Sequence, residues 1–156
     1  MKDYAQYDAT GLAELVRSRQ VSASELLDAA MARADAVEPT LNAIPQRLDA
    51  FGRAAAAQPA SGPFAGVPFL LKDYGQELDG VPNICGTAAL KTRIVQGDSA
   101  YAARCKAAGL VIFGRTATPE FALKGVTEPE AFGPTRNPIN PAHTPGGSSG
   151  GAAAVV

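Results

Sequence analysis

Residues 67–73 read VPFLLKD, a short apolar run that ends on a lysine and an aspartate. A run of this length without helical periodicity predicts a buried strand. A helix predicted over residues 98–108 follows, and Gly109 ends it in a position that suits a left-handed residue. A second apolar run, LVIF at 110–113, predicts the next strand. Strand, crossover helix and strand in this order indicate a parallel arrangement, so the predicted fold class is α/β.

The first half of the chain predicts a layer of helices ahead of this sheet. Asp8 or Thr10 can cap a short helix with apolar residues at helical spacing. Residues 22–25 read SASE, a capping box that begins a second helix, which must end near Pro39. A third helical run, rich in alanine, is predicted over residues 49–58.

The C-terminal third is irregular in its pattern. Thr118-Pro119-Glu120 predicts a helix start, with the threonine as cap and the proline at the first helical position. Residues 125–151 are rich in Gly, Pro, Asn and Thr, and long ordered loops in compact domains are usually functional. Within them, PGGSSGG at 145–151 can hold two hydroxyls and several N–H groups in a tight arrangement. A flexible Gly/Ser linker is the alternative, whereas no lysine follows as in a phosphate-binding loop.

Lys72 is the second candidate for chemistry. A lysine at the end of a buried strand is partly desolvated, which disfavours the ammonium and lowers its pKa. A neutral amine can act as a general base toward a serine hydroxyl. The alternative is an ordinary lysine that points to solvent or pairs with Asp73.

Four motifs together resemble the amidase-signature family. They are, in order, GVPFLLKD at 66–73, GRTATPEF at 114–121, GPTRNP at 133–138 and TPGGSSGG at 144–151. The resemblance runs from about residue 5 to the last residue and is similar in spacing as well as in order. It implies an α/β amidase-signature fold, with a mixed sheet core flanked by helices and an N-terminal helical layer.

The resemblance also implies a Ser-Ser-Lys triad. Lys72 matches the base, and Ser148 matches the middle serine that relays the proton. The peptide bond between Gly147 and Ser148 is then cis, and Ser149 supports the network by hydrogen bonding. The nucleophile is expected about two dozen residues beyond Ser148, outside this chain. No metal or organic cofactor is implied.

Residues 1–156 are thus expected to be the N-terminal portion of a single amidase-signature domain, truncated before the nucleophile. The implied activity is hydrolysis of carboxylic amide C–N bonds through an acyl-enzyme, with this chain inactive alone. The stretch TEPEAFG at 127–133 looks closest to the branch that contains 6-aminohexanoate cyclic-dimer hydrolase. The alternatives are the A subunit of a tRNA-dependent amidotransferase and a non-catalytic truncated product.

The composition agrees with a globular domain, with 46% apolar and 19% charged residues. A net charge of −1 gives no reason to expect nucleic acid or an anionic membrane as partner, so the expected partner is a small-molecule amide. Cys85 and Cys105 are too few for a disulfide scaffold, and the single His143 leaves no histidine metal site. Without an apolar leader or an apolar run of about 20 residues, a cytoplasmic protein is expected. A homo-oligomer is left open.

Overall fold

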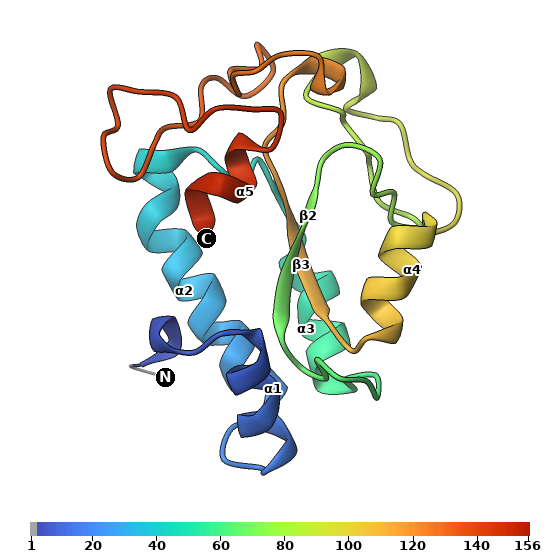
Figure 1. Cartoon of the computed structure of the whole chain (residues 1–156). Coiled ribbons are helices and arrows are strands. Elements are labelled where there is room, and N and C mark those ends of the chain that lie inside the picture. Colours follow the sequence, from blue (N-terminus) through green and yellow to red (C-terminus); the bar gives the residue numbers. More distant parts are fainter. Residues whose placement is uncertain (1–2) are drawn as a thin grey trace. The chain divides into compact units, whose positions relative to one another are not determined.

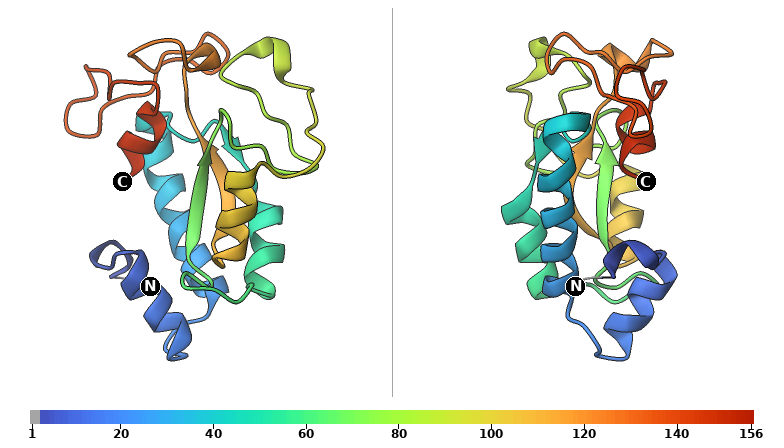
Figure 2. Two further views of the ribbon diagram at one scale, coloured as in Figure 1. Left: turned by 45° about the vertical axis from the view of Figure 1, so that its right-hand side comes forward. Right: turned by 90° about the vertical axis from the view of Figure 1, so that its left-hand side faces the viewer.

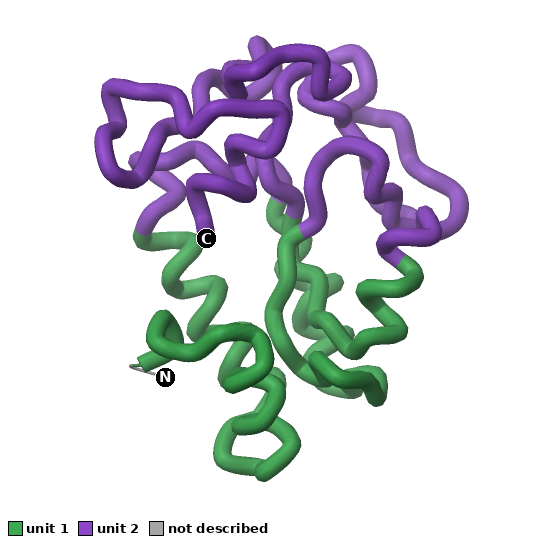
Figure 3. Tube along the Cα trace, viewed as in Figure 1, with its two compact units in different colours: residues 1–36, 47–70, 103–114 green, residues 37–46, 71–102, 115–156 purple. Residues whose placement is uncertain are grey.

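The structure is a computed structural model that describes residues 3–156. Its contacts divide the chain into two compact units, which Figure 3 shows in different colours. The first unit comprises the described residues up to Ala36 together with residues 47–70 and 103–114, and the second comprises residues 37–46, 71–102 and 115–156.

The chain alternates helices and strands after a helical N-terminal part (Figure 1). The elements are α1 (Ala9–Arg17), α2 (Ala23–Leu41), β1 (Gln46–Arg47), α3 (Asp49–Ala57), β2 (Pro68–Lys72), α4 (Ala100–Ala107), β3 (Val111–Thr116) and α5 (Gly150–Val155), with 3-10 turns η1 (Tyr4–Gln6), η2 (Ala88–Leu90) and η3 (Glu120–Ala122). No helix in the described part of the chain is both long and apolar enough to cross a membrane. The predicted α/β class is confirmed.

The three strands form one sheet in the order β1-β3-β2. Val111 N donates to Val67 O at 2.8 Å, and Asp73 N donates to Thr116 O at 3.1 Å, so β2 and β3 run parallel. Figure 2 shows their two arrows pointing the same way. The α4 helix connects them, as the predicted strand, helix and strand require.

The β1 strand makes the sheet mixed. Leu48 N donates to Phe113 O at 2.9 Å, whereas Ala117 N donates to Ala43 O at 2.8 Å. The residue numbers rise on one side as they fall on the other, which is an antiparallel pairing. All six residues of β3 are buried, because the strand lies between two neighbours.

The predicted helix starts are confirmed in the first unit. Asp8 Oδ1 accepts a hydrogen bond from Gly11 N at 2.7 Å and caps α1. The capping box of α2 is closed in both directions, since Ser22 Oγ accepts from Glu25 N and Glu25 Oε2 accepts from Ser22 N. Apolar faces of these helices pack against Val67, the residue before β2, in a core of Leu12, Ala13, Leu26 and Val67.

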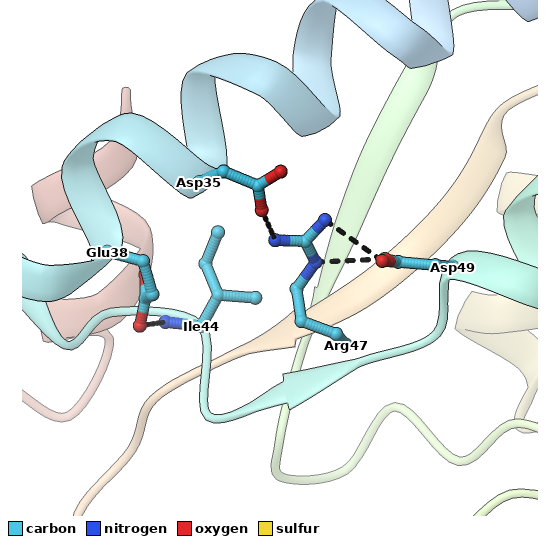
Figure 4. A network of polar contacts seen from close by, with 5 residues as sticks. All are labelled: Asp35, Glu38, Ile44, Arg47 and Asp49. Atoms are coloured by element: carbon cyan, nitrogen blue, oxygen red, sulfur yellow. Dashed lines mark hydrogen bonds and ion pairs between the residues drawn. The ribbon is translucent and has the colours of Figure 1, made fainter.

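The end of α2 differs slightly from the prediction. Pro39 lies inside the helix, which ends two residues later at Leu41. A proline in the last turn removes one backbone donor, and the helical bonding continues past it because Asn42 N donates to Glu38 O at 2.9 Å. Glu38 then holds the chain after the helix, since its Oε1 accepts from Ile44 N at 2.8 Å (Figure 4).

Arg47 joins two helices of the first unit. Its guanidinium donates to Asp35 of α2 at 2.6 Å and to Asp49, the first residue of α3, at 2.9 Å (Figure 4). Burial alone would lower the pKa of Arg47, but the two carboxylates outweigh burial and raise it. The ion pairs fix where α3 begins.

The helix predicted from Thr118 onward is wrong. The chain forms only the three-residue turn η3, and Thr118 does not cap it. Phe121 and Ala122 have φ angles of 52° and 58°, which lie in the left-handed region and cannot continue a right-handed helix. Glu120 Oε1 accepts from Glu130 N at 2.8 Å, which turns the chain back on itself.

Replacing Asp8 by alanine should lower the free energy of unfolding by about 1 kcal/mol, because the first turn of α1 loses its only observed side-chain cap. Chemical denaturation followed by circular dichroism measures this change. Asp8→Asn keeps a side-chain oxygen that can accept from Gly11 N and serves as the control. An Asp8→Ala variant as stable as Asp8→Asn would contradict the assignment of this cap.

Candidate active site

Lys72 and the two predicted serines lie together in the second unit. Lys72 is the last residue of β2, and its Nζ lies 2.8 Å from Ser148 Oγ and 2.9 Å from Ser149 Oγ. Ser148 is 76 positions away in the sequence. The serines belong to residues 146–150, here called the serine loop, which leads into α5. The peptide bond between Gly147 and Ser148 is cis, as the resemblance implies.

The environment of Lys72 lowers the pKa of its amine. Burial lowers the pKa of its amine, and the amine is within hydrogen-bonding distance of two hydroxyls. The neighbouring Asp73 carboxylate is engaged elsewhere, because its two oxygens accept from Ile84 N and Gly86 N, each at 3.0 Å. Lys72 therefore contacts the serine loop. The alternative interpretation, a lysine that only points to solvent or pairs with Asp73, does not describe it.

Side chains hold the backbone of Lys72 on both sides. Gln76 Oε1 accepts from Lys72 N at 2.6 Å. Arg115 Nη1 donates to Lys72 O at 3.3 Å and to Gln76 O at 2.9 Å. Arg115 is fully buried, which lowers the pKa of its guanidinium. These contacts stop the strand end from shifting and so fix where the Lys72 side chain begins.

Burial also acts on the acid beside this lysine. Asp73 is 1% exposed, and burial raises the pKa of its carboxyl. Hydrogen bonds from the backbone and the charge of Arg115 oppose that shift. The loop at Ile84 and Gly86 is thereby hydrogen-bonded to Asp73, the residue that follows Lys72.

The serine loop is held at Ser148 by a residue that the sequence did not single out for this role. Thr118 Oγ1 donates to Ser148 O at 2.9 Å, so the threonine predicted to cap a helix contacts the loop instead. Ser149 stands at the N-cap position of α5 but makes no side-chain cap. Its hydroxyl is within reach of Lys72, which explains why it is not used on the helix.

Two glycines allow the loop to lie against neighbouring backbone. A Cβ atom on Gly147 would come within 2.9 Å of the Val126 backbone. A Cβ atom on Gly151 would overlap Ala117 N and crowd Ala43 O at 2.7 Å. Side chains at these positions would push the serines away from Lys72, which is a steric reason for the Gly-rich pattern.

Sequence reasoning thus selected Lys72, Gly147, Ser148 and Ser149, and the structure brings all four into one place. It missed the residues that hold them, namely Gln76, Arg115, Thr118 and Thr127. Arg115, Thr118 and Thr127 act through side-chain contacts with backbone 19 to 43 positions away, for which the sequence carries no periodic signal, whereas Gln76 bonds to Lys72 N only four positions earlier. Among the described residues, no group of three or more His, Cys, Asp or Glu side chains could bind a metal ion.

A family model described as Amidase matches residues 25–156. The chain belongs to the amidase-signature family. Three comparisons illustrate the similarity. The 6-aminohexanoate-cyclic-dimer hydrolase of Paenarthrobacter ureafaciens is 45% identical over 151 residues, which are 96% of this chain and 30% of that protein. The predicted family is confirmed, and the predicted branch is among the relatives.

A second relative performs a different role. The A subunit of the glutamyl-tRNA(Gln) amidotransferase of Acidothermus cellulolyticus is 40% identical over 165 residues, which cover all of this chain and 32% of that protein. The solved structure of 6-aminohexanoate cyclic dimer hydrolase with its substrate aligns at a TM-score of 0.90 and 44% identity. It covers 96% of this chain and 32% of that one. This chain spans about a third of each of these amidase-signature proteins.

Replacing Gly151 by alanine should lower the free energy of unfolding by about 1–3 kcal/mol, because its Cβ would meet backbone atoms that cannot move aside freely. Thermal or chemical denaturation measures the loss. Gly125→Ala is the control, since nothing lies within 4 Å of a Cβ at that position. Equal stability of the two variants would mean that α5 does not pack against Ala117 as described.

Lys72 should titrate below the ordinary lysine pKa of about 10.4, because burial penalises its ammonium. Between the lowered pKa and the ordinary one, the unfolded chain binds more protons than the folded chain, so this residue makes stability rise with pH. Lysine-selective NMR across a pH series measures the midpoint, and Lys72→Gln assigns the resonance. A midpoint at or above the ordinary value would contradict the described environment.

Proposed function

We propose that this chain carries the base and the relay serine of an amidase that hydrolyses carboxylic amide C–N bonds. The observation that supports this best is the position of Lys72 Nζ, 2.8 Å from Ser148 Oγ and 2.9 Å from Ser149 Oγ, in a chain of the amidase-signature family. A general base must lie within hydrogen-bonding distance of the proton that it removes, and Lys72 meets that requirement.

In the proposed mechanism, neutral Lys72 accepts the proton of Ser148 Oγ. Ser148 in turn accepts the proton of a nucleophilic serine, whose oxygen attacks the amide carbonyl carbon. The proton returns along the same path to the leaving amine as the C–N bond breaks. Water then attacks the acyl-enzyme ester and releases the acid, regenerating the serine. The scheme uses side chains only and needs no cofactor.

Ser149 and Gly147 have supporting roles in this proposal. The Ser149 hydroxyl shares the amine of Lys72 with Ser148, which keeps the amine pointed at the serine loop. Gly147 permits the loop to lie on the Val126 backbone. We place the nucleophile on a second Gly-Gly-Ser motif in a longer protein, of which residues 1–156 are the N-terminal portion of one domain. The relatives, about three times as long, support this.

We further propose small linear or cyclic amides as substrates and a cytoplasmic location. The similarity to a 6-aminohexanoate-cyclic-dimer hydrolase supports the substrate class. The two free, buried cysteines are in keeping with a reducing compartment. In this proposal the ligand is the small amide alone, with no nucleic acid and no membrane, and self-association is left open.

The second candidate is the A subunit of a tRNA-dependent amidotransferase. It is favoured by the 40% identity to such a protein over the whole of this chain. Such a protein is expected to need partner proteins and to pass ammonia onward, whereas an amidase acts alone. Hydrolysis of a simple amide by the purified protein without partners therefore separates the two candidates.

Lys72→Ala and Ser148→Ala should each lower the hydrolysis of a simple aryl amide by about a thousandfold or more, because each removes a step of the proton path. The assay uses the protein encoded by the complete reading frame. Sequencing of the DNA beyond codon 156 defines that frame. Lys124→Ala, which removes an exposed lysine, is the control. The 156-residue chain alone should hydrolyse nothing.

Wild-type activity that survives both substitutions would rule out the Lys72–Ser148 path. Activity in the 156-residue chain alone would show that the nucleophile lies within it. Hydrolysis that appears only when partner proteins are added would favour the amidotransferase. A stop codon directly after Val156 would leave the non-catalytic truncated product as the remaining interpretation.

A further inference from the structure

Thr127 is a fully buried residue whose hydroxyl contacts both ends of the serine loop. Its Oγ1 donates to Gly146 O at 2.9 Å and accepts from Gly150 N at 3.1 Å. A hydroxyl has one proton to donate and two lone pairs, so both bonds can exist at the same time. A threonine is therefore used here as donor and acceptor at once.

The two bonds lie on either side of the proposed catalytic serines. Gly146 and Gly150 flank Ser148 and Ser149, which both lie within hydrogen-bonding distance of Lys72 Nζ. The hydroxyl thus closes a ring around the three residues at the centre of the loop. Because both ends of the loop are tied to one atom, the span between them is fixed.

Packing shows that the loop lies directly on Thr127. A Cβ atom on Gly150 would overlap Thr127 Oγ1 and come within 2.6 Å of Thr127 Cβ. The backbone of the preceding Val126 lies similarly close to Gly147. Thr127 itself is anchored, since its carbonyl accepts from Thr135 N at 2.9 Å. The serine loop therefore rests on a fixed support.

We propose that Thr127 is a positioning residue that sets the distances from Ser148 and Ser149 to Lys72. This inference rests on the proposed amidase function. Thr127 is fully buried and acts by holding the loop ends at one separation. Loss of the hydroxyl would let the loop relax, and a shift of about 1 Å in a proton path can lower a rate by about a hundredfold.

Thr127→Val tests the proposal, because valine has nearly the shape of threonine and makes neither bond. In the longer protein, kcat for an aryl amide should fall by about ten- to a hundredfold, with KM within about twofold. Thr127→Ser, which keeps the hydroxyl, should retain most of kcat. Thr135→Val is the matched control, since Thr135 is also buried, its hydroxyl donates to Asn42 O rather than to the serine loop, and its backbone bond to Thr127 O is kept.

A second measurement does not depend on activity. In the 156-residue chain, hydrogen exchange of the Gly150 amide should be about tenfold faster in Thr127→Val than in wild type and unchanged in Thr135→Val. If the longer wild-type protein hydrolyses no amide, the proposed function fails. The exchange still measures whether the Thr127 hydroxyl binds the Gly150 amide.

Three results would overturn the inference. The first is a Thr127→Val variant with wild-type kcat and wild-type Gly150 exchange. The second is an equal loss of kcat in Thr135→Val, which would reduce the effect to general destabilisation. The third is a Thr127→Ser variant as impaired as Thr127→Val, because shape rather than the hydroxyl would then matter.

Discussion

The hydrogen bond from Asp73 N to Thr116 O fixes the register of the two strand ends on which the candidate site is built. It places Lys72, one residue earlier, beside the segment that leaves β3. That segment then holds the other half of the site. Ala117 O accepts from the first turn of α5 at 3.2 Å, and Thr118 Oγ1 holds the serine loop through Ser148 O. Three consecutive residues thus determine how the lysine and the serines meet, and a shift of one residue between the strands would separate them.

Neither Asp73 nor Arg115 competes with the serine hydroxyls for contact with the Lys72 amine. Asp73 points its carboxylate at the backbone of the Ile84 and Gly86 loop, where the N–H groups compensate for its burial. The buried Arg115 donates from Nη1 to the backbone carbonyls of Lys72 and Gln76. Because no salt bridge from Asp73 would stabilise the ammonium, burial is free to lower the pKa of Lys72. The proposed role of Lys72 as a base needs desolvation without an ion pair, and the surrounding contacts provide that environment.

The sequence was sufficient for the parts of the structure that depend on local patterns or on a complete motif. Apolar runs predicted β2 and β3, Asp8 and the capping box predicted the starts of α1 and α2, and four ordered motifs predicted the family. Thr118 was misinterpreted because Thr-Pro-Glu is a good helix start, and only the left-handed turn after it shows that no helix follows. The bonds of Thr127 to Gly146 and Gly150 join residues 19 and 23 positions apart, so no local pattern could reveal them.

The base half of the proposed site is complete within the second unit. Residues 71–102 provide Lys72 and Gln76, which holds the Lys72 backbone. Residues 115–156 provide Arg115, Thr118, Thr127 and the serine loop. The hydrogen bonds that Gln76, Arg115 and Thr118 make to Lys72 and Ser148 are therefore internal to this unit. In the proposed mechanism, the nucleophile would then meet the amine of Lys72 and the hydroxyl of Ser148 already in place. Catalysis through such a path gains from groups positioned before the substrate arrives, because no reorganisation is needed at the moment of reaction.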